Sequence, residues 1–373
     1  MDEYNEKTDN LDFKDLIEKG IVLDNEGRVK GEILSKDELK KRSVMGVKYT
    51  GDGCAYYDVC ISNMQKMIRR GKVKEAIRTY IRIVEMNGQF ISNVVNRLCK
   101  VIVSEDIGVA SNYIVKECYD FLVYYESIKG KDDISEDKEF RDRSIKLITN
   151  LCLCKKSRLV DNTVSYYRKC EISDLNIKAL LEEDFDTIFE IFKKVDDFKI
   201  GVLCLSKLMY KETKNKITFE DNDIKKLLSR KKKSIYHVWN YILVESKKLN
   251  NINILTSSSI FDINCNLLHI FDMGGEVILN LVHAYLNIKL YKLIDWNTYK
   301  FDVIHNWDDV KKEDIYCDPC AYDKHTFYNK HINKPTSFFF RYGAKLKNKV
   351  DNKELLEIED DIYSKCVDLY KDV

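Results

Sequence analysis

Residues 97–122, RLCKVIVSEDIGVASNYIVKECYDFL, contain two helical patterns that meet at a short polar joint, SEDIG, at 104–108. Apolar side chains recur at helical spacing on both sides of this joint. Carboxylates near the start of a helix are favoured by its dipole and by its unbonded N–H groups. Gly108 suits a left-handed turn position. We therefore expect Glu105 and Asp106 to cap and orient a helix-to-helix joint; an acid–base or metal role would need partners from elsewhere in the chain.

Helical periodicity continues on both sides of the joint. The stretch YYDVCISNMQKMIRRG, residues 56–71, is amphipathic and stops at Gly71, which fits a helix C-terminal cap. Residues 55–170 predict about six helices with short loops, as helix bundles have. Only two prolines, Pro319 and Pro335, and 14 glycines are present to interrupt helices. The sequence thus predicts an all-α fold.

Changes in pattern divide the chain into four expected regions. Residues 1–53 are charged and weakly patterned, typical of an arm or linker. Residues 54–170 form the helical-bundle domain, and 171–299 a second helical region. Residues 300–373 are aromatic and irregular, and end in a helical pattern.

The composition of the 373 residues is 45% hydrophobic and 33% charged, which indicates a globular protein. The formal net charge is +1, so any contact with nucleic acid must come from a local patch. The chain has no phosphate-binding loop, no G-x-S-x-G and no H-E-x-x-H, which argues against nucleotide hydrolysis and the common hydrolase chemistries.

The sequence has no secretory signal and no run of 18 apolar residues, so we expect no membrane contact. The 12 cysteines mostly follow apolar helical patterns, which favours reduced thiols in an intracellular protein, cytoplasmic or nuclear. The abundance of Asn, Lys, Ile and Tyr is typical of AT-rich genomes, including those of large viruses. A viral factory or virion is therefore a further expected location.

Residues 55–168 resemble the C-terminal helical domain of the MgsA/RarA proteins, replication-fork AAA+ ATPases related to clamp loaders. The matching elements are a Tyr-Asp helix, an Arg-x-Gly turn, the SEDIG-x-A signature and a Lys-Ser helix junction. They lie at Tyr57-Asp58, Arg69-Arg70-Gly71, 104–110 and Lys156-Ser157.

In that family the domain holds subunits together, and the ATPase module lies before it. Some 50 residues precede the domain here, too few for an AAA+ core, so the resemblance does not imply ATPase activity. It implies a non-enzymatic oligomerisation or adaptor protein in DNA replication, repair or viral DNA processing. Such a protein would be a homo-oligomer or part of a larger assembly, with DNA or replication proteins as candidate partners. The alternatives are a nucleic-acid-binding module, a structural or virion component, and an enzyme of an unrecognised type.

The segment YCDPCAYDKHTFYNKH offers a candidate metal site. Cys317, Cys320, His325 and His331 give C-x2-C-x4-H-x5-H, a chemically suitable zinc set with an unusually short gap between cysteine and histidine. The alternatives are an aromatic loop with reduced cysteines and a redox C-x-x-C pair. No other cofactor is expected.

The same segment also resembles a second stretch of the MgsA/RarA family, Asp-x-His-Thr followed by a Phe and a Gly-x-x-Leu. Here the matching residues are Asp323, His325, Thr326, Phe338, Gly343 and Leu346. This resemblance implies that Asp323 and His325 are structural, and that His325 forms hydrogen bonds instead of binding zinc.

Four basic clusters are candidates for contact with phosphates, or else solvated helix ends. They comprise Arg69, Arg70, Lys72 and Lys74; Lys155, Lys156 and Arg158; Lys345, Lys347 and Lys349; and Arg230, Lys231, Lys232 and Lys233. Nearby aromatic residues could stack on bases or belong to the core: Tyr236, Trp239 and Phe338–Phe340. For Trp296 and Trp307 we expect packing.

Overall fold

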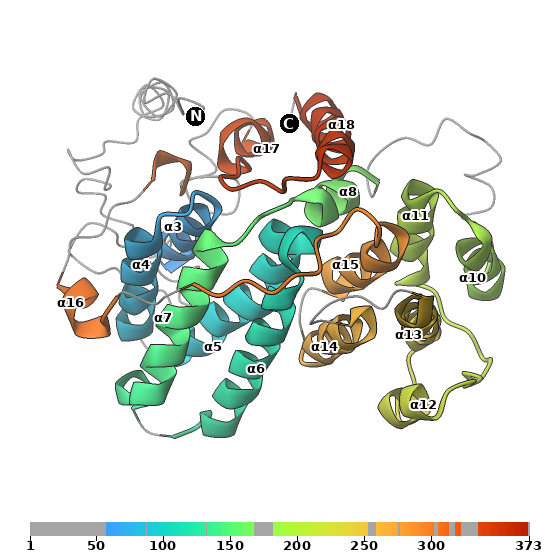
Figure 1. Cartoon of the computed structure of the whole chain (residues 1–373), viewed down its shortest axis with the longest axis horizontal. Coiled ribbons are helices and arrows are strands. Elements are labelled where there is room, and N and C mark those ends of the chain that lie inside the picture. The colour runs from blue at the N-terminus through green and yellow to red at the C-terminus, as the bar shows by residue number, and fades with distance from the viewer. Residues whose placement is uncertain are drawn as a thin grey trace, which may run out of the picture.

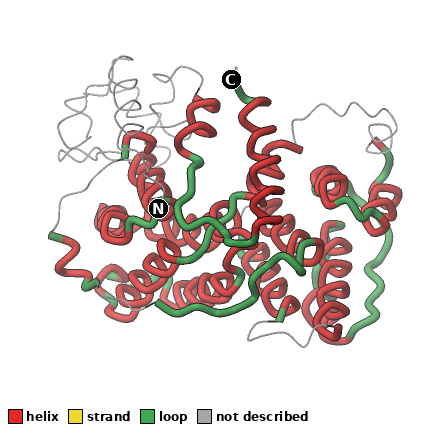
Figure 2. The backbone as a smooth tube through the Cα atoms, turned by 45° about the horizontal axis from the view of Figure 1, so that its top comes forward, coloured by secondary structure: helices red, strands yellow, loops and turns green. Residues whose placement is uncertain are grey.

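A computed structural model describes residues 57–86, 88–131, 133–167, 182–252, 259–274, 277–301, 305–312, 318–321 and 335–371. These ranges contain helices and loops and no strand; a single isolated parallel bridge joins Lys156 and Lys349 (Figure 2). The predicted all-α fold is confirmed. No helix within these ranges is both long and apolar enough to span a bilayer. The expected N-terminal arm, 1–53, lies outside the described residues.

The first half of the chain folds into a layered bundle around the SEDIG joint. Its elements are α3 (Tyr57–Arg69), α4 (Val73–Met86), α5 (Gly88–Asn96), η1 (Arg97–Ile107), η2 (Gly108–Ser111), α6 (Tyr113–Ile128), η3 (Ile134–Glu136), α7 (Lys138–Leu153) and α8 (Leu159–Tyr167). The second half supplies α10 (Phe185–Lys194), α11 (Phe198–Leu208), α12 (Asn222–Leu228), α13 (Ile235–Ile252), α14 (Ile260–Asp272) and α15 (Val277–Lys289). The C-terminal part supplies α16 (Trp307–Lys311), η4 (Pro319–Ala321), α17 (Pro335–Phe338), η6 (Phe339–Gly343) and α18 (Lys353–Leu369).

Helix α15 joins the two halves. Figure 1 shows α3–α7 on one side of the molecule and α10–α13 on the other, with α8 and α15 between them. α15 packs against α8 and η1 of the first half and against α11, α13 and α14 of the second. Its buried Leu281, Val282 and Leu286 belong to one hydrophobic core with residues of both halves.

The C-terminal elements return to the first half of the chain. α18 packs along α8, η4 packs on α3, and α16 packs on α4. The buried Trp307 ring meets Tyr80 edge-to-face with ring centroids 6.1 Å apart. Trp296 is also buried, so the packing role expected for both tryptophans is confirmed. The four-region division remains a prediction.

The predicted C-terminal cap at Gly71 is confirmed. The Gly71 N–H donates to the Ile68 carbonyl at 3.1 Å, and the Lys72 N–H donates to the Met67 carbonyl at 2.9 Å. These two bonds, with φ +67° at Gly71, form a Schellman motif that satisfies carbonyls at the end of α3. The cap turns the chain directly from α3 into α4.

The SEDIG joint is built on wide helical turns. η1 has π-helical hydrogen bonding through Ile107, and the Gly108 N–H donates to the Val103 carbonyl. Gly108 has φ +50° and ψ −143°, a conformation that side chains disfavour. A Cβ there would lie 2.7 Å from the Ser157 carbonyl oxygen. Glycine is needed at this position for both reasons.

We expect Gly108→Ala to lower the free energy of unfolding by more than about 2 kcal/mol, because backbone strain and a contact with a backbone carbonyl add together. Urea unfolding followed by circular dichroism measures this. Gly130→Ala is the matched control, since Gly130 also has a positive φ but nothing within 4 Å of the added Cβ. Equal losses in the two variants would show that the contact with Ser157 is unimportant.

Candidate functional site

The SEDIG carboxylates lie in a buried ion network with two arginines. Asp106 Oδ1 accepts from Arg69 Nε at 2.6 Å and from Arg158 Nη1 at 2.7 Å. Glu105 Oε1 accepts from Arg69 Nη2 at 2.7 Å and from Arg158 Nη1 at 3.2 Å. Gln65 Nε2 donates to the second oxygen of Asp106 at 2.7 Å. Asp106 is fully buried, so it depends on these partners for its charge to be tolerated.

The network also binds the C-terminal part of the chain. Arg69 Nη1 donates to the Gly343 carbonyl at 2.8 Å. The guanidinium carbons of Arg69 and Arg158 lie 5.3 and 5.2 Å from the centroid of the Phe339 ring, within cation–π range. Helix η6 is therefore held by the same cations that neutralise the SEDIG carboxylates.

The expected capping role of Glu105 and Asp106 is wrong in its chemistry. Helix η2, which follows the joint, has no side-chain cap hydrogen bond, because both carboxylates face the arginines instead. The expectation that they shape a joint, and are not a free acid pair, agrees with this geometry. Asp106 is fully buried and both of its oxygens accept hydrogen bonds, so it has no access to a substrate.

A third carboxylate makes the charges of the network unequal. Asp161 accepts from Arg158 Nη2, so three carboxylates share two guanidinium groups. Burial opposes ionisation of Glu105, but Arg69 and Arg158 outweigh it and lower its pKa. For Asp161, burial prevails over Arg158 and raises the pKa to about 6. Asp161 is thus the carboxylate whose charge the network compensates least.

This inequality predicts different costs for two amide substitutions. Asp106→Asn should lower the free energy of unfolding by ~3–5 kcal/mol, because both Asp106 oxygens accept from buried donors and the amide nitrogen would turn its own N–H groups toward one of them. Asp161→Asn should cost less than about 1 kcal/mol at pH 7.5, because the amide oxygen still accepts from Arg158 and a poorly compensated charge is removed. Urea unfolding of both variants tests this; equal losses would contradict the assignment.

The Lys-Ser junction packs against the network. Lys156 is fully buried, and its Nζ donates to the Cys152 carbonyl at 2.6 Å and the Cys154 carbonyl at 3.0 Å. Ser157 Oγ donates to Glu359 Oε2 at 2.5 Å. The other Glu359 oxygen accepts from the Arg158 N–H at 3.2 Å. This junction therefore caps the end of α7 and attaches α18 to the joint.

A second buried polar arrangement connects the two halves of the molecule. Ser104 Oγ lies 3.1 Å from His283 Nδ1, and His283 Nε2 lies 2.9 Å from Asn112 Oδ1. Further amide hydrogen bonds of 2.9–3.0 Å continue this hydrogen-bonded line through α15, α14 and α13, by way of Asn287, Asn264 and Ser246. All six side chains are at most 1% exposed.

The direction of these hydrogen bonds follows from the last asparagine. Asn264 Nδ2 donates to the Ala284 carbonyl, which fixes its amide orientation and leaves its oxygen to accept from Asn287. In the same way Asn287 accepts from Asn112, whose oxygen must accept from His283 Nε2. His283 is then the Nε2–H tautomer, and its Nδ1 accepts from Ser104 Oγ.

Ser104, His283 and Asn112 have the order of a serine nucleophile, its base and an orienting amide. All three are closed off from solvent, and burial lowers the pKa of His283 to about 3. A nucleophile that no substrate can reach has no catalytic use. We interpret the line as a packing element that fixes how α15 sits against η1 and α6.

The neutral state of His283 predicts a pH dependence of stability. Unfolding returns its pKa to about 6.5, so the unfolded chain takes up a proton below that pH and the folded chain does not. The stabilisation is complete above pH 6.5 and is lost progressively down to pH 3. Between pH 7.5 and 5 this group should cost about 2 kcal/mol, and His283→Gln should remove that part of the decline in urea unfolding. A variant with the wild-type decline would contradict the assignment.

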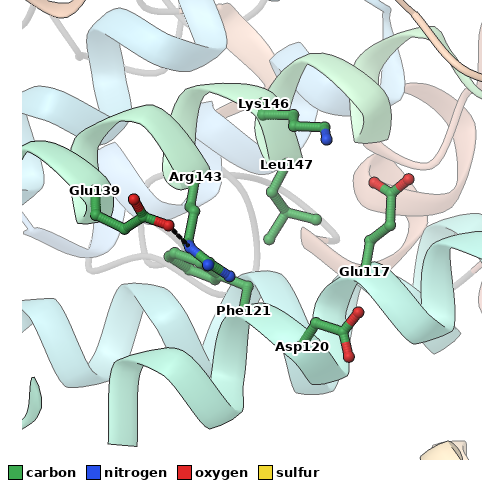
Figure 3. A pocket seen from close by; sticks show the side chains of 7 residues that line it. All are labelled: Glu117, Asp120, Phe121, Glu139, Arg143, Lys146 and Leu147. Atoms are coloured by element: carbon green, nitrogen blue, oxygen red, sulfur yellow. Dashed lines mark hydrogen bonds and ion pairs between the residues drawn. The ribbon is translucent and has the colours of Figure 1, made fainter. Parts of the chain in front are cut away.

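A surface groove of about 350 Å³ lies between α6 and α7 (Figure 3). Its α6 side carries Glu117 and Asp120, and its α7 side carries Arg143 and Lys146. Glu139 accepts from Arg143 Nε at 2.6 Å within the groove. Glu117 accepts from Asn150 at 2.6 Å, and burial raises the pKa of its carboxyl. No serine, cysteine or histidine lines the groove, and its charged residues do not form a recognisable catalytic set.

The structure corrects the phosphate-binding hypothesis for three cations. Arg69, Lys156 and Arg158 are each at most 1% exposed and are held by internal acceptors, so they cannot reach phosphates. The base-stacking hypothesis is also wrong for Tyr236, Trp239 and Phe338–Phe340, which are buried in the core.

The other predicted cations differ in whether they form ion pairs and in how exposed they are. Arg70 pairs with the buried Asp318, and Lys72 is half-buried. Lys155 Nζ lies 2.9 Å from Asp351, and Lys231 Nζ lies 2.7 Å from Asp272. Three cations of the last cluster are exposed: Arg230, Lys232 and Lys233.

The zinc hypothesis stays a prediction. Cys317, Asp323, His325 and His331 lie outside the described residues, and Cys320 is buried. Among the residues that are described, no group of three or more His, Cys, Asp or Glu side chains is placed to hold a metal ion.

Sequence reasoning missed the polar line through His283. Its signal was present in α15, VILNLVHAYLNIK, where Asn280, His283 and Asn287 recur at helical spacing within an apolar helix. Glu359 gave no such signal, because its partner Ser157 is 202 residues away.

Comparison with protein-family models, with curated proteins and with solved structures found no match to this chain. The function must therefore be inferred from the residues and their geometry.

Proposed function

We propose that this chain is a non-enzymatic oligomerisation or adaptor subunit that acts in DNA replication, repair or viral DNA processing. The proposal rests on the resemblance to the helical collar domain of the MgsA/RarA proteins. One observation supports it above the others: the Arg-x-Gly turn, the SEDIG joint, the Lys-Ser junction and Gly343 of the second segment meet at a single buried site.

The two resembling segments are far apart in sequence and joined in space. Arg69, from the Arg-x-Gly turn, donates to the Gly343 carbonyl across 274 residues. In return, the Lys347 N–H donates to the Arg69 carbonyl at 2.9 Å. If the resemblance were accidental, nothing would require its first segment to contact its second.

The same site favours a scaffold over an enzyme. The SEDIG carboxylates and the Ser104–His283 pair have internal partners and no solvent access, apart from slight exposure of Glu105. Such fully satisfied polar networks fix one arrangement of helices. A rigid helical body with this interior fits a protein that presents surfaces to other subunits.

Light scattering after size exclusion tests the proposal. A collar-like subunit should elute as a closed oligomer, a tetramer by analogy with the resembled family, with a mass that is a whole multiple of 43.9 kDa. Open, polydisperse assemblies would instead favour the structural or virion alternative. A strict monomer that gains no mass with replication proteins or DNA would refute the proposal.

A further inference from the structure

The turn between α12 and α13 carries cations that the fold leaves unused. Arg230, Lys232 and Lys233 are exposed and form no ion pair or side-chain hydrogen bond with the described parts of the chain. Lys231, between them, pairs with Asp272 at 2.7 Å and lies over the Tyr236 ring. The turn is thus anchored through one cation, and the other three point at solvent.

A neighbouring loop adds two more cations beside the same turn. The Thr213 N–H donates to Ser234 Oγ at 2.8 Å, and the Asn215 carbonyl lies 3.1 Å from His237 Nε2. These contacts hold the loop along the start of α13. Lys214 and Lys216, which flank Asn215, are exposed and also without a partner in the described chain. We call Lys214, Lys216, Arg230, Lys232 and Lys233 the basic ledge.

Acidic residues close to the ledge are occupied by other donors. Asp186 accepts from Thr213 and Asn215, and Glu212 accepts from Ser234. Asp221 and Asp223, at the opposite end of α12, both accept from Lys247. Their charges remain, but each of these acids already accepts from a donor of its own, and none of them forms an ion pair with a ledge cation.

Arg230 is favourably placed next to the C-terminus of α12, but Lys232 and Lys233 are not favoured by the helix that follows. The ledge residues Arg230, Lys232 and Lys233 follow the end of α12 and immediately precede α13, whose N-terminal dipole is positive. Positive side chains at a helix N-terminus are disfavoured, and neighbouring like charges repel. An external anion would relieve both effects.

We propose that the basic ledge binds the phosphodiester backbone of duplex nucleic acid. The partner follows from what surrounds the cations. The apolar side chains Ile224 and Leu228 of α12 are buried, so this helix offers no apolar face to insert into a lipid bilayer. Tyr236 and Trp239 are buried too, so these rings cannot stack on the bases of a single strand. Among the described residues, the large exposed ring nearest in sequence is Tyr210, just before the Lys214–Lys216 loop; a single ring beside five cations suits a regular array of phosphates better than a run of stacked bases.

The direct test is fluorescence anisotropy with the full chain and a labelled duplex of arbitrary sequence. We expect a Kd of ~10⁻⁶–10⁻⁴ M near physiological salt, and log K should fall with log[salt] at a slope of about −3 to −4.5 for three to five phosphates. Duplex DNA and duplex RNA should bind alike. A clear preference for single-stranded oligo(dT), or for phosphatidylserine vesicles over duplexes, would overturn the proposal.

A matched pair of variants distinguishes the contribution of the ledge to binding from the effect of the chain's net charge. Replacing the five ledge cations by Gln should weaken duplex binding at least tenfold and flatten the salt slope. The control replaces five exposed cations that each pair with an acid three or four residues away, which removes the same charge: Lys116, Lys129, Lys248, Lys353 and Lys365. The control should change binding less than about twofold; equal weakening of both variants would overturn the proposal.

Three further measurements show whether the loss of binding is specific to the ledge charges and not caused by misfolding or disassembly. Lys232→Glu alone should weaken binding more than Lys232→Arg, which should bind like wild type. The five-Gln ledge variant should keep the wild-type thermal midpoint or exceed it, because it relieves repulsion. Its mass by light scattering should also be unchanged, so failure of the ledge and failure of the proposed assembly give different readouts.

Discussion

The buried charge of Asp106 is the constraint on which the joint depends. A carboxylate with no exposure needs strong compensation, and two arginines supply it from opposite directions along the chain. Arg69 ends α3 and Arg158 precedes α8, so η1 can keep its charge only when both helices are in place. The ion network therefore makes the folding of α3, η1 and α8 mutually dependent.

Other contacts extend this coupling outward. Arg69 holds η6 through Gly343, and Glu359 holds α18 through the Ser157 hydroxyl and the Arg158 N–H. The close approach of Gly108 to Ser157 leaves no room for a side chain between the joint and the Lys-Ser junction. The hydrogen-bonded line through His283 then ties this first half to α15. The interior thereby specifies one arrangement of helices, and any function must be exerted at the surface.

The sequence predicted local features well because helices are encoded locally. Apolar spacing indicated the helices, and Gly71 was identified as a cap from its position after an amphipathic run. The position of the joint was also evident from SEDIG. These features depend on residues a few positions apart, which periodicity and turn chemistry report directly.

The contacts of the joint could not be predicted, because they join distant residues. Asp106 meets Arg69 across 37 residues and Arg158 across 52, and a single sequence carries no signal of such pairs. The capping expectation failed for that reason. The same limit made buried arginines look like surface cations. By contrast, the basic ledge was partly visible as the run 230–233, and only the fold showed that Lys214 and Lys216 lie beside it.

A double-mutant cycle between Asp106 and Arg158 tests the central claim most directly. Asp106→Leu, Arg158→Met and the double variant would be compared by urea unfolding at pH 7.5. The ion network predicts that the double variant loses ~2–3 kcal/mol less than the sum of the single losses, because Arg158→Met alone leaves three carboxylates to Arg69, and the double change removes one of those carboxylates. Losses that add within about 0.5 kcal/mol would show that the two charges do not depend on each other, and would contradict this account of the joint.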